Sequence, residues 1–471
     1  MPIFNNKYHI PQHTSWMKKF YMLLSCLGLS SSLQALSLQE TLGYGLDHAP
    51  DVQIAMGEEF IGRTNLSSKA GAFLPVIDAN CDLVHDHYSQ QNDTDPATTL
   101  WRKDYNLVIS QNVFDGLKRY NDYEQAQSGL RATIWSTKDR ILNKLTDIGS
   151  VYFKVLLAQE RVTLAKENYK RLKEIANLIE QRSAQGLSRE VDRIQAQGRV
   201  ATAHASVINT LAELHKQQAL FKDVTGGLNP IDLEVTELSA LMPAEFNQYL
   251  ESVHQYGARV RAAAFQQDAA YYQYQSAKSP FFPQVYGLAR FEFRKNIDGN
   301  PNHQVNTEVG VNLTYNVFRG AQDMQQLSAQ AIRYQQARFE VKRQRNEIDY
   351  LATASWEDWQ SAQKSYQYRC DHERSIGTVV SAYKDQFMVG QRSLFDLLDV
   401  YNEWYYTQNA AAEDRAQLRI AEIYMTALNG SLVSILPAKS AEKIFFTPEK
   451  EEEFVRSYWV SPTWTEEDYS K

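Results

Sequence analysis

Four short segments of the chain alternate apolar and polar residues with a period of two. The alternation is clearest in residues 76–84, where the apolar positions are Ile77, Ala79, Cys81 and Leu83. Because successive side chains of a strand point to opposite faces, this period predicts strands with one apolar and one polar face. Strands of an outer-membrane barrel have this pattern, and so do strands of a half-buried soluble sheet. We expect strands at about 76–88, 104–113, 284–294 and 306–317.

After each strand pair, apolar residues recur at alternating steps of three and four positions. Between Gly116 and Gly186 there is no proline, and the apolar positions include Ile141, Leu145, Ile148, Tyr152, Val155, Ala158 and Val162. These steps predict a long helix with a seam for packing against another helix. We expect long helices at 116–185 and 319–389, each about 100 Å in length at 1.5 Å per residue. Shorter return helices are expected at 188–225 and 393–429.

The two halves of the chain repeat one another. Moving 204 positions along the sequence takes Phe114, Gly116, Gly186, Asp192 and Gly226 to Phe318, Gly320, Gly390, Asp396 and Gly430. Shared helical composition does not produce a constant offset over so long a span, so the pattern indicates a duplication. We expect a first structural repeat at 36–232, a second at 233–436 and an acidic periplasmic tail at 437–471.

Helix lengths predict how each repeat is arranged. Helical stretches at about 49–72 and 256–279 end at the prolines that follow them, since a proline ring blocks helix continuation. Each return helix is shorter than its long helix by about the length of this stretch. We therefore expect the two shorter helices to stack end to end beside the long one. Tight turns at Gly186 and Gly390 then close the end away from the strands.

Composition agrees with a long helical protein and excludes several classes. The 21 glycines and 13 prolines are few for 471 residues, so long stretches run without a helix breaker. Hydrophobic residues at 43% exclude a disordered chain. A mean hydropathy of -0.48 excludes a bundle of membrane-spanning helices. With a formal net charge of -7, we expect no nucleic-acid partner.

The first 35 residues have the features of an export signal. They contain a basic start, an apolar run at 20–29 and a small-residue cleavage site ending at Ala35. We expect residues 1–35 to be a signal peptide, and the alternative is an apolar helix that stays in the protein. The residues before Cys26 resemble a lipoprotein sequence, so lipidation of Cys26 is a lesser alternative.

Four strands are too few to close a membrane barrel, because single-chain barrels begin at eight strands and lipid does not tolerate an open sheet edge. If the sheet lies in a membrane, the chain must oligomerise. The helices then continue the barrel as a cylinder around a water-filled duct. An exported chain of this kind is a conduit from the outer membrane across the periplasm. The competing interpretation is a soluble periplasmic coiled-coil interaction protein with a small sheet.

The order of these elements carries a family resemblance. A helix, Phe73-Leu74-Pro75, a strand pair, Asn112-Val113-Phe114-Asp115-Gly116, a long helix, a glycine turn and a return helix all occur twice. This order resembles the TolC-type outer-membrane efflux proteins over about 37–436. The resemblance implies a mainly α fold with a β-barrel portion. It implies a homotrimer with one shared twelve-strand barrel in outer-membrane lipid, continued by an α-helical periplasmic tunnel.

The turn at Gly390 is the most specific part of this resemblance. Gly390, Arg392, Asp396 and Asp399 match the family's G-x-R-[ST]-x-x-D-x-x-D turn. The match implies that Arg392 belongs to a charged network that holds the periplasmic entrance shut. It also implies acidic rings of Asp396 and Asp399, which share one helix face and would favour cations. The plainer alternative is ordinary helix-start charge. Phe387 stands where some members carry a gate tyrosine, and we include it in the expected gate.

The two glycine turns are the expected contact surface for partner proteins. The resemblance implies that a periplasmic adaptor docks at the tips, which contain Gly186, Leu187, Ser188, Gly390 and Gln391. An inner-membrane ABC or RND transporter would complete the machine. The second turn looks more like the exit ducts of type I secretion systems than those of drug-efflux pumps. We therefore expect a type I secretion duct, with the outer-membrane component of a multidrug efflux pump as the alternative.

Enzyme and metal interpretations have little support. The sequence contains no HExxH, GxSxG or P-loop motif, so we expect neither catalysis nor a cofactor. Cys81, His85 and His87 share one strand face, but we expect Cys81 to face lipid and the histidines to mark the membrane interface rather than a metal site. Tyr88 and Trp101 flank a polar loop and are expected in the outer aromatic girdle of the barrel.

Overall fold

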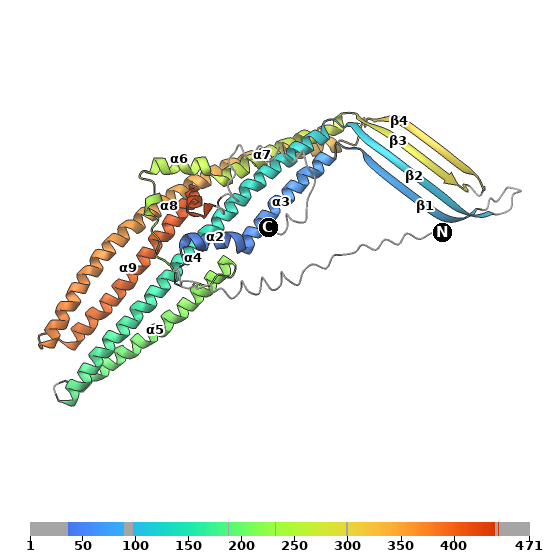
Figure 1. The fold of residues 1–471 in the computed structure, drawn as a ribbon. Coiled ribbons are helices and arrows are strands. Elements are labelled where there is room, and N and C mark those ends of the chain that lie inside the picture. Colours follow the sequence, from blue (N-terminus) through green and yellow to red (C-terminus); the bar gives the residue numbers. More distant parts are fainter. Residues whose placement is uncertain are drawn as a thin grey trace, which may run out of the picture.

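The structure is a computed structural model that describes residues 36–88, 98–186, 188–230, 232–297, 300–438 and 441. Helices make up most of this part of the chain, and an antiparallel sheet of four strands lies at one end of the helical rods (Figure 1). The expected signal peptide, Cys26, Leu187 and nearly all of the expected tail lie outside the described residues. In the described part of the chain, no helix has the length and apolar character required to cross a membrane.

The first half of the chain runs from two short helices through a strand pair into two long helices. Its elements are α2 (Leu38–His48), α3 (Pro50–Gly71), β1 (Val76–Tyr88), β2 (Thr98–Phe114), α4 (Lys118–Ala184) and α5 (Glu190–Thr225). Ser37 and Glu40 form a capping box at the start of α2, and Pro50 occupies the first turn of α3, where its missing N–H costs nothing. Helix α4 contains 67 residues, which corresponds to a rod of about 100 Å.

The second half repeats this order. Its elements are α6 (Phe246–Tyr256), α7 (Ala258–Ser276), β3 (Gln284–Lys295), β4 (His303–Thr314), α8 (Gln322–Met388) and α9 (Leu394–Leu428), with short 3-10 turns η1 (Ser239–Leu241), η2 (Ser279–Phe281) and η3 (Ser431–Ile435). Helix α8 also contains 67 residues. The two long hairpins, α4–α5 and α8–α9, lie side by side and point away from the sheet (Figure 1).

The duplication extends to unusual backbone conformations. Gly116 and Leu117 have φ angles of 67° and 64°, and their counterparts Gly320 and Ala321 have φ angles of 58° and 59°. Residues other than glycine seldom adopt this left-handed region, because their Cβ crowds the backbone there. The same strained turn therefore starts both long helices.

The shorter helices stack end to end in both halves. A Cβ added at Gly226, just after α5, would overlap the carbonyl oxygen of His48, two residues before α3 begins. A Cβ added at Gly430, just after α9, would lie 3.2 Å from the Cβ of Tyr256, two residues before α7 begins. Each return helix thus ends where the short helix of its own half begins.

The middle of the rods is held by a large hydrophobic cluster. It joins α2, α4, α5 and α9 and contains fully buried residues such as Leu42, Leu46, Leu145 and Ile148. The Tyr152 hydroxyl donates to the Leu36 carbonyl oxygen at 2.9 Å or to the Glu234 carbonyl oxygen at 2.6 Å. This buried tyrosine connects the start of the described chain to the linker between the two halves.

The sheet has the order β1-β2-β3-β4, so β1 and β4 each have one unpaired edge. Residues directly opposite one another on neighbouring strands share a face. One face is apolar, as in the row Cys81, Tyr105, Phe293 and Val305. The other face carries the ion pairs Asp86–Arg102, Asp104–Arg294, Glu292–Arg294 and Arg290–Glu308. This is the two-sided pattern of strands with lipid on one side and water on the other.

Two strands differ in their bounds from the alternation pattern. Strand β2 begins at Thr98 rather than at about 104, because its ladder with β1 continues until Thr98 lies opposite Tyr88. Strand β4 ends at Thr314 rather than at about 317, because Thr314 pairs with Gln284, the first residue of β3 after Pro283. Beyond that pair, β4 has no partner in the described part of the chain. The long helices and return helices begin and end within three residues of the expected positions.

Candidate functional site

The tips of the two long hairpins are packed together by one hydrophobic cluster. Its buried residues come from α4, α5, α8 and α9, and they are Leu172, Ile179, Ala196, Ala203, Val380, Phe387, Leu394, Leu397, Leu398, Val400 and Tyr401. Burial raises the pKa of the Tyr401 phenol above its ordinary value. The tips are thus part of a packed structure, and only their turns are open.

Arg392 holds the beginning of α9 against the end of α8. Its Nε donates to Gln386 Oε1 at 3.0 Å, and its guanidinium carbon lies 4.2 Å from the centre of the Tyr383 ring. Gly390 makes the turn with φ at 79°, and the backbone N–H of Gln391 donates to the carbonyl oxygen of Gln386 at 2.8 Å. These contacts of Arg392 all lie within one hairpin, so its expected contact across the entrance stays a prediction.

Asp396 belongs to the start of α9. Its backbone N–H donates to Ser393 Oγ at 3.2 Å, and the Ser393 backbone N–H donates to Asp396 Oδ2 at 3.3 Å. This reciprocal capping box satisfies the first turn of the helix. Asp399 lies three residues further along α9 and is exposed. Asp396 therefore has the helix-start role that the sequence left open, and the acidic rings stay a prediction.

Phe387 lies inside the tip cluster, where only 6% of its surface is exposed. The guanidinium carbon of Arg182, from the first hairpin, lies 5.3 Å from the centre of its ring. Arg182 also donates to the carbonyl oxygen of Met388 at 3.4 Å. Phe387 therefore joins the two hairpins by packing, and its expected role in the gate stays a prediction. Sequence reasoning missed Arg182 because its partners lie in the other half of the chain.

The first tip has a different arrangement of charge. Gly186 makes its turn with φ at 74°, and among the described residues no atom outside its chain neighbours lies within 4 Å of a Cβ placed at Gly186 or at Gly390. Ser188 Oγ donates to Asp192 Oδ2 at 3.4 Å. Arg193 Nε donates to Glu190 Oε2 at 2.9 Å, and this hydrogen bonding holds the pKa of the exposed Glu190 carboxyl below its ordinary value. The expected adaptor contact at the two tips stays a prediction.

The register of the sheet separates the two expected girdle residues. Trp101 lies opposite His85 on the apolar face, with the two rings 4.7 Å apart. Tyr88 lies opposite Thr98, on the same face as Asp86 and Arg102. Tyr88 therefore belongs to the polar face rather than to the girdle beside Trp101. The reason is the period of two, which places positions 85 and 88 on opposite faces.

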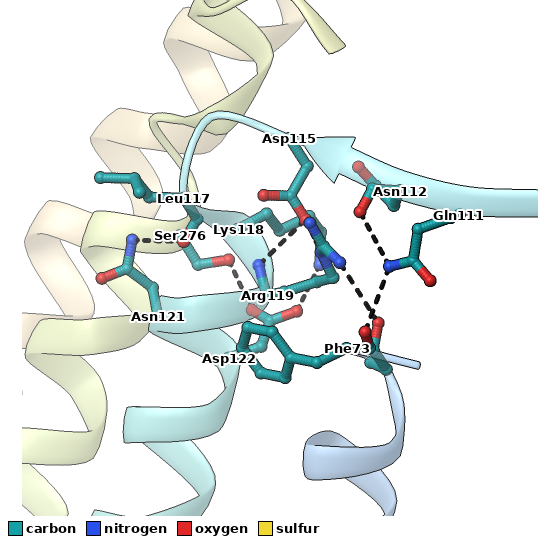
Figure 2. Close-up of polar contacts among 11 residues, drawn as sticks. Phe73, Gln111, Asn112, Asp115, Leu117, Lys118, Arg119, Asn121, Asp122 and Ser276 are labelled. Atoms are coloured by element: carbon teal, nitrogen blue, oxygen red, sulfur yellow. Dashed lines mark hydrogen bonds and ion pairs between the residues drawn. The ribbon is translucent and has the colours of Figure 1, made fainter. Parts of the chain in front are cut away.

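The junction between β2 and α4 contains a buried ion pair. Asp115 follows β2 and is only 6% exposed. Its Oδ2 accepts from the Arg119 backbone N–H at 3.2 Å and from Arg119 Nε at 2.9 Å (Figure 2). The Arg119 guanidinium carbon lies 5.4 Å from the Phe73 ring centre, and Gln111 Nε2 donates to the Phe73 carbonyl oxygen at 3.1 Å. The ion pair therefore connects the end of α3 to the start of α4.

The second half of the chain covers this junction. A Cβ added at Gly116 would lie 2.8 Å from the Ser279 carbonyl oxygen and 2.9 Å from the Phe282 Cβ. Ser276 Oγ donates to Asp122 Oδ1 at 2.6 Å (Figure 2). The segment between α7 and β3 is thus fitted closely against the segment between β2 and α4.

Cys81, His85 and His87 are not arranged as a metal site. His87 Nδ1 lies 2.9 Å from Thr99 Oγ1, and His85 packs on Trp101. Within the residues that the structure describes, no group of three or more His, Cys, Asp or Glu side chains could hold a metal ion.

A duplicated rod of helices with a two-faced strand pair in each half defines the class of the protein. The sequence model of the family described as "Outer membrane efflux protein" matches residues 46–227 and 251–431. These two matches cover most of the chain and correspond to its two halves. The chain belongs to this family, and it localises to the outer membrane with its helices extending into the periplasm.

Two relatives are similar over most of their length. The outer membrane efflux protein BepC of Brucella suis biovar 1 (strain 1330) is 20% identical over 354 residues, which cover 75% of this chain and 77% of BepC. The alkaline protease secretion protein AprF of Pseudomonas aeruginosa is 21% identical over 424 residues, which cover 84% of each protein.

Solved structures show the same fold. The CmeC outer membrane channel of Campylobacter jejuni superimposes with a TM-score of 0.74 over 97% of this chain and 98% of that one, at 14% identity. The outer-membrane channel OprN superimposes with a TM-score of 0.72 over 83% of this chain and 89% of that one, at 18% identity. At this level of identity, the comparison concerns the arrangement of the chain and not its cargo.

Proposed function

We propose that the chain is one subunit of a homotrimeric exit duct through which cargo leaves the cell. The observation that carries this proposal is the sheet of four strands with two unpaired edges and an exposed apolar face. Neither an open edge nor a row of unpaired backbone groups is tolerated in lipid. Pairing of β4 with β1 of the next copy removes both edges, and three copies give twelve strands.

The duplication predicts the register of this pairing. Within one chain, Ile109 of β2 lies opposite Ala289 of β3. Adding the 204-residue offset to position 109 gives position 313, which lies in β4. The segments Phe73-Leu74-Pro75 and Phe281-Phe282-Pro283 are related by an offset of 208 residues, and subtracting it from position 289 gives position 81, which lies in β1. Leu313 of β4 should therefore lie opposite Cys81 of the next copy. Both residues are apolar-face residues, so the register continues that face around the barrel.

The helical tips are the proposed docking surface for an adaptor. The turns that end the α4–α5 and α8–α9 hairpins lie at the end of the rods furthest from the sheet (Figure 1). An inner-membrane transporter of the ABC or RND type would deliver cargo through this adaptor. In the same proposal, Arg392 stabilises the closed entrance and Asp396 and Asp399 set the charge of the lumen.

Type I protein secretion is the favoured activity of the duct. The relative AprF is described as a protease secretion protein, and it is similar to this chain over 84% of its length. The second candidate is drug efflux, which the name of the relative BepC favours. Deleting the chain should remove particular proteins from the culture medium in the first case. In the second case, it should lower resistance to small toxic compounds while leaving the secreted proteins unchanged.

Membrane fractionation and planar bilayers test the duct itself. We expect detergent, and not high salt, to release the full chain from membranes. The purified protein should give discrete conductance steps in a planar bilayer. A chain that salt releases, or a purified oligomer that never conducts, would favour the soluble coiled-coil interaction protein instead.

A further inference from the structure

The apolar face of the sheet ends in a row of basic residues. Counting away from the helices, the last fully apolar row is Cys81, Tyr105, Phe293 and Val305. The next row is Leu83, Lys103, Lys295 and His303. Beyond it on β1 and β2, His85 lies opposite Trp101 and His87 lies opposite Thr99. We call the set Lys103, Lys295, His303, His85 and Trp101 the basic row.

The two lysines of the basic row lie directly opposite each other. Lys103 of β2 is the cross-strand partner of Lys295 of β3. Like charges in this position repel each other and destabilise a sheet. The same arrangement would be relieved by an anion placed between the two ammonium groups.

The strands do not supply that anion from within. The acidic residues Asp82, Asp86, Asp104 and Glu292 alternate with the basic row and so lie on the opposite face. Asp86, Asp104 and Glu292 form ion pairs with arginines of that opposite face. Neither lysine has an ion pair with any residue in the described ranges.

The position of the basic row matches the edge of a membrane. The apolar positions of β4 run from Leu313 to Val305, which is about 27 Å along a strand. A strand tilted by about 40° then spans roughly 20 Å of membrane thickness, close to the apolar band of outer-membrane barrels. Because the helices extend into the periplasm, the basic row lies at the outer boundary of this band. Asn296 Nδ2 donates to the Trp101 carbonyl oxygen at 2.8 Å and ties the β3–β4 turn to β2 at this level.

We propose that the basic row binds a phosphate group on the headgroup of a phosphorylated glycolipid in the outer leaflet, of the lipid A type. The lysines neutralise the phosphate, while Trp101 and the apolar rows contact the sugar and the acyl chains. This inference rests on the proposed membrane insertion of the sheet. It adds a specific lipid partner, which insertion alone does not require.

Lipid titration of the purified oligomer tests this proposal. Binding of diphosphoryl lipid A in detergent is measured by native mass spectrometry for the natural chain and for Lys103→Gln with Lys295→Gln. We expect the double variant to bind about tenfold more weakly or worse. Dephosphorylated lipid A should bind the natural chain and the variant equally. A matched control is Lys342→Gln with Lys364→Gln, which removes the same charge from exposed positions of α8 and should bind like the natural chain.

A second measurement separates binding from folding. In vesicles of phosphatidylethanolamine alone, the Lys103 and Lys295 variant should be at least as heat-stable as the natural chain, because the repulsion between the lysines is gone. Adding about 20% diphosphoryl lipid A should stabilise only the natural chain. The proposal would be overturned if lipid A raised the melting temperature of both proteins equally. It would also be overturned if inorganic pyrophosphate without lipid A stabilised the natural chain as much as lipid A does. A chain that conducts in both membranes and prefers neither lipid would overturn it and leave the proposed duct intact.

Discussion

The two junctions between strand and long helix have the same backbone but different surroundings. Gly116 and Gly320 both start their turn in the left-handed region. Gly116 is enclosed by Ser279 and Phe282, whereas in the described part of the chain no atom lies within 4 Å of a Cβ placed at Gly320. Val317 and Phe318, just before the second junction, are 85% and 80% exposed. Both halves of the chain contain this turn, but the described residues of a single chain cover only the turn at Gly116.

The charge at the two junctions is reversed. The first junction pairs Asp115 with Arg119, and the second pairs Arg319 with Asp323 at 3.8 Å. The first pair is mostly buried, whereas in the second pair the Arg319 side chain is 47% exposed and the Asp323 side chain 24% exposed. We infer that the segment of the next copy that contains Leu74 covers the second junction, as Phe282 covers the first. Leu74 corresponds to Phe282 in the duplication and is 67% exposed.

Valine at the junction glycines should have the largest effect. Gly116→Val forces a β-branched residue into the left-handed region, at about 1–2 kcal/mol, and into overlap with Ser279 and Phe282. We expect loss of the folded subunit, measured as loss of protease-resistant chain. Gly320→Val has open space in one chain, so its subunit should fold but fail to assemble. Gly198→Val, at an open position of α5, should assemble normally. Normal oligomers of Gly320→Val would show that no copy covers the second junction.

Removing the first charged residue of each ion pair should lower the free energy of unfolding by different amounts at the two junctions. Asp115→Ala leaves the half-buried Arg119 without its carboxylate partner and removes the acceptor for the Arg119 backbone N–H, which should cost about 2–3 kcal/mol. Arg319→Ala should cost less than about 1 kcal/mol in a subunit held in detergent as a monomer. Urea unfolding followed by circular dichroism measures both. Similar losses of unfolding free energy in the two variants would mean that burial of the first ion pair adds nothing to stability.

The two tips differ at position 392. Changing this residue tests whether Arg392 holds the entrance shut or is an ordinary helix-start charge. Arg392 corresponds to Ser188 of the first half, so Arg392→Ser copies the first tip onto the second. Losing the contacts with Tyr383 and Gln386 should shift the entrance toward its open state by about two- to fivefold. Conductance of purified oligomers in planar bilayers measures this shift. Arg345→Ser, at an exposed position of α8, is the control. Unchanged conductance would leave Arg392 as a local contact of its own hairpin.

The smallest expected effect is a change in pH dependence. Burial raises the pKa of Glu422 above its ordinary value of 4.5, although Arg419 donates to it, and the first half has Gln218 at this position. A carboxyl with a raised pKa binds protons more strongly in the folded state, so stability falls as pH rises from about 4.5 through the folded pKa. Glu422→Gln should flatten this part of the curve of melting temperature against pH. The exposed Glu357→Gln should leave it unchanged, and an identical slope in Glu422→Gln would contradict the assignment.

Periodic signals made the elements predictable from the sequence. The period of two marks the strands because one face is apolar and the other polar, and the seam from Ile141 to Val162 marks a helix that packs on a neighbour. The constant offset then relates Gly186 to Gly390 and predicts two equivalent turns. The sequence also allowed the face of Tyr88 to be predicted correctly, because alternation counted from Cys81 places Tyr88 on the polar face with Asp86.

Contacts between the two halves could not be predicted in the same way. The packing of Arg182 on Phe387 and the cover that Phe282 gives to Gly116 depend on how two hairpins lie together in space. No local period encodes that arrangement. The capping role of Asp396 was visible as an alternative because Ser393 precedes it by three residues, the spacing of a capping box.

Crosslinking across the proposed seam between copies tests the central claim most directly. In a chain with Cys26→Ser and Cys370→Ser, Leu313→Cys should react with the natural Cys81 of the next copy under oxidation or with a short bifunctional thiol reagent. The account predicts a covalent ladder in a denaturing gel that ends at three chains. Asn312→Cys, on the other face of β4, should give little product. Monomers from Leu313→Cys, or equal ladders from both variants, would contradict a barrel closed by β4 and β1 in the register that the duplication predicts.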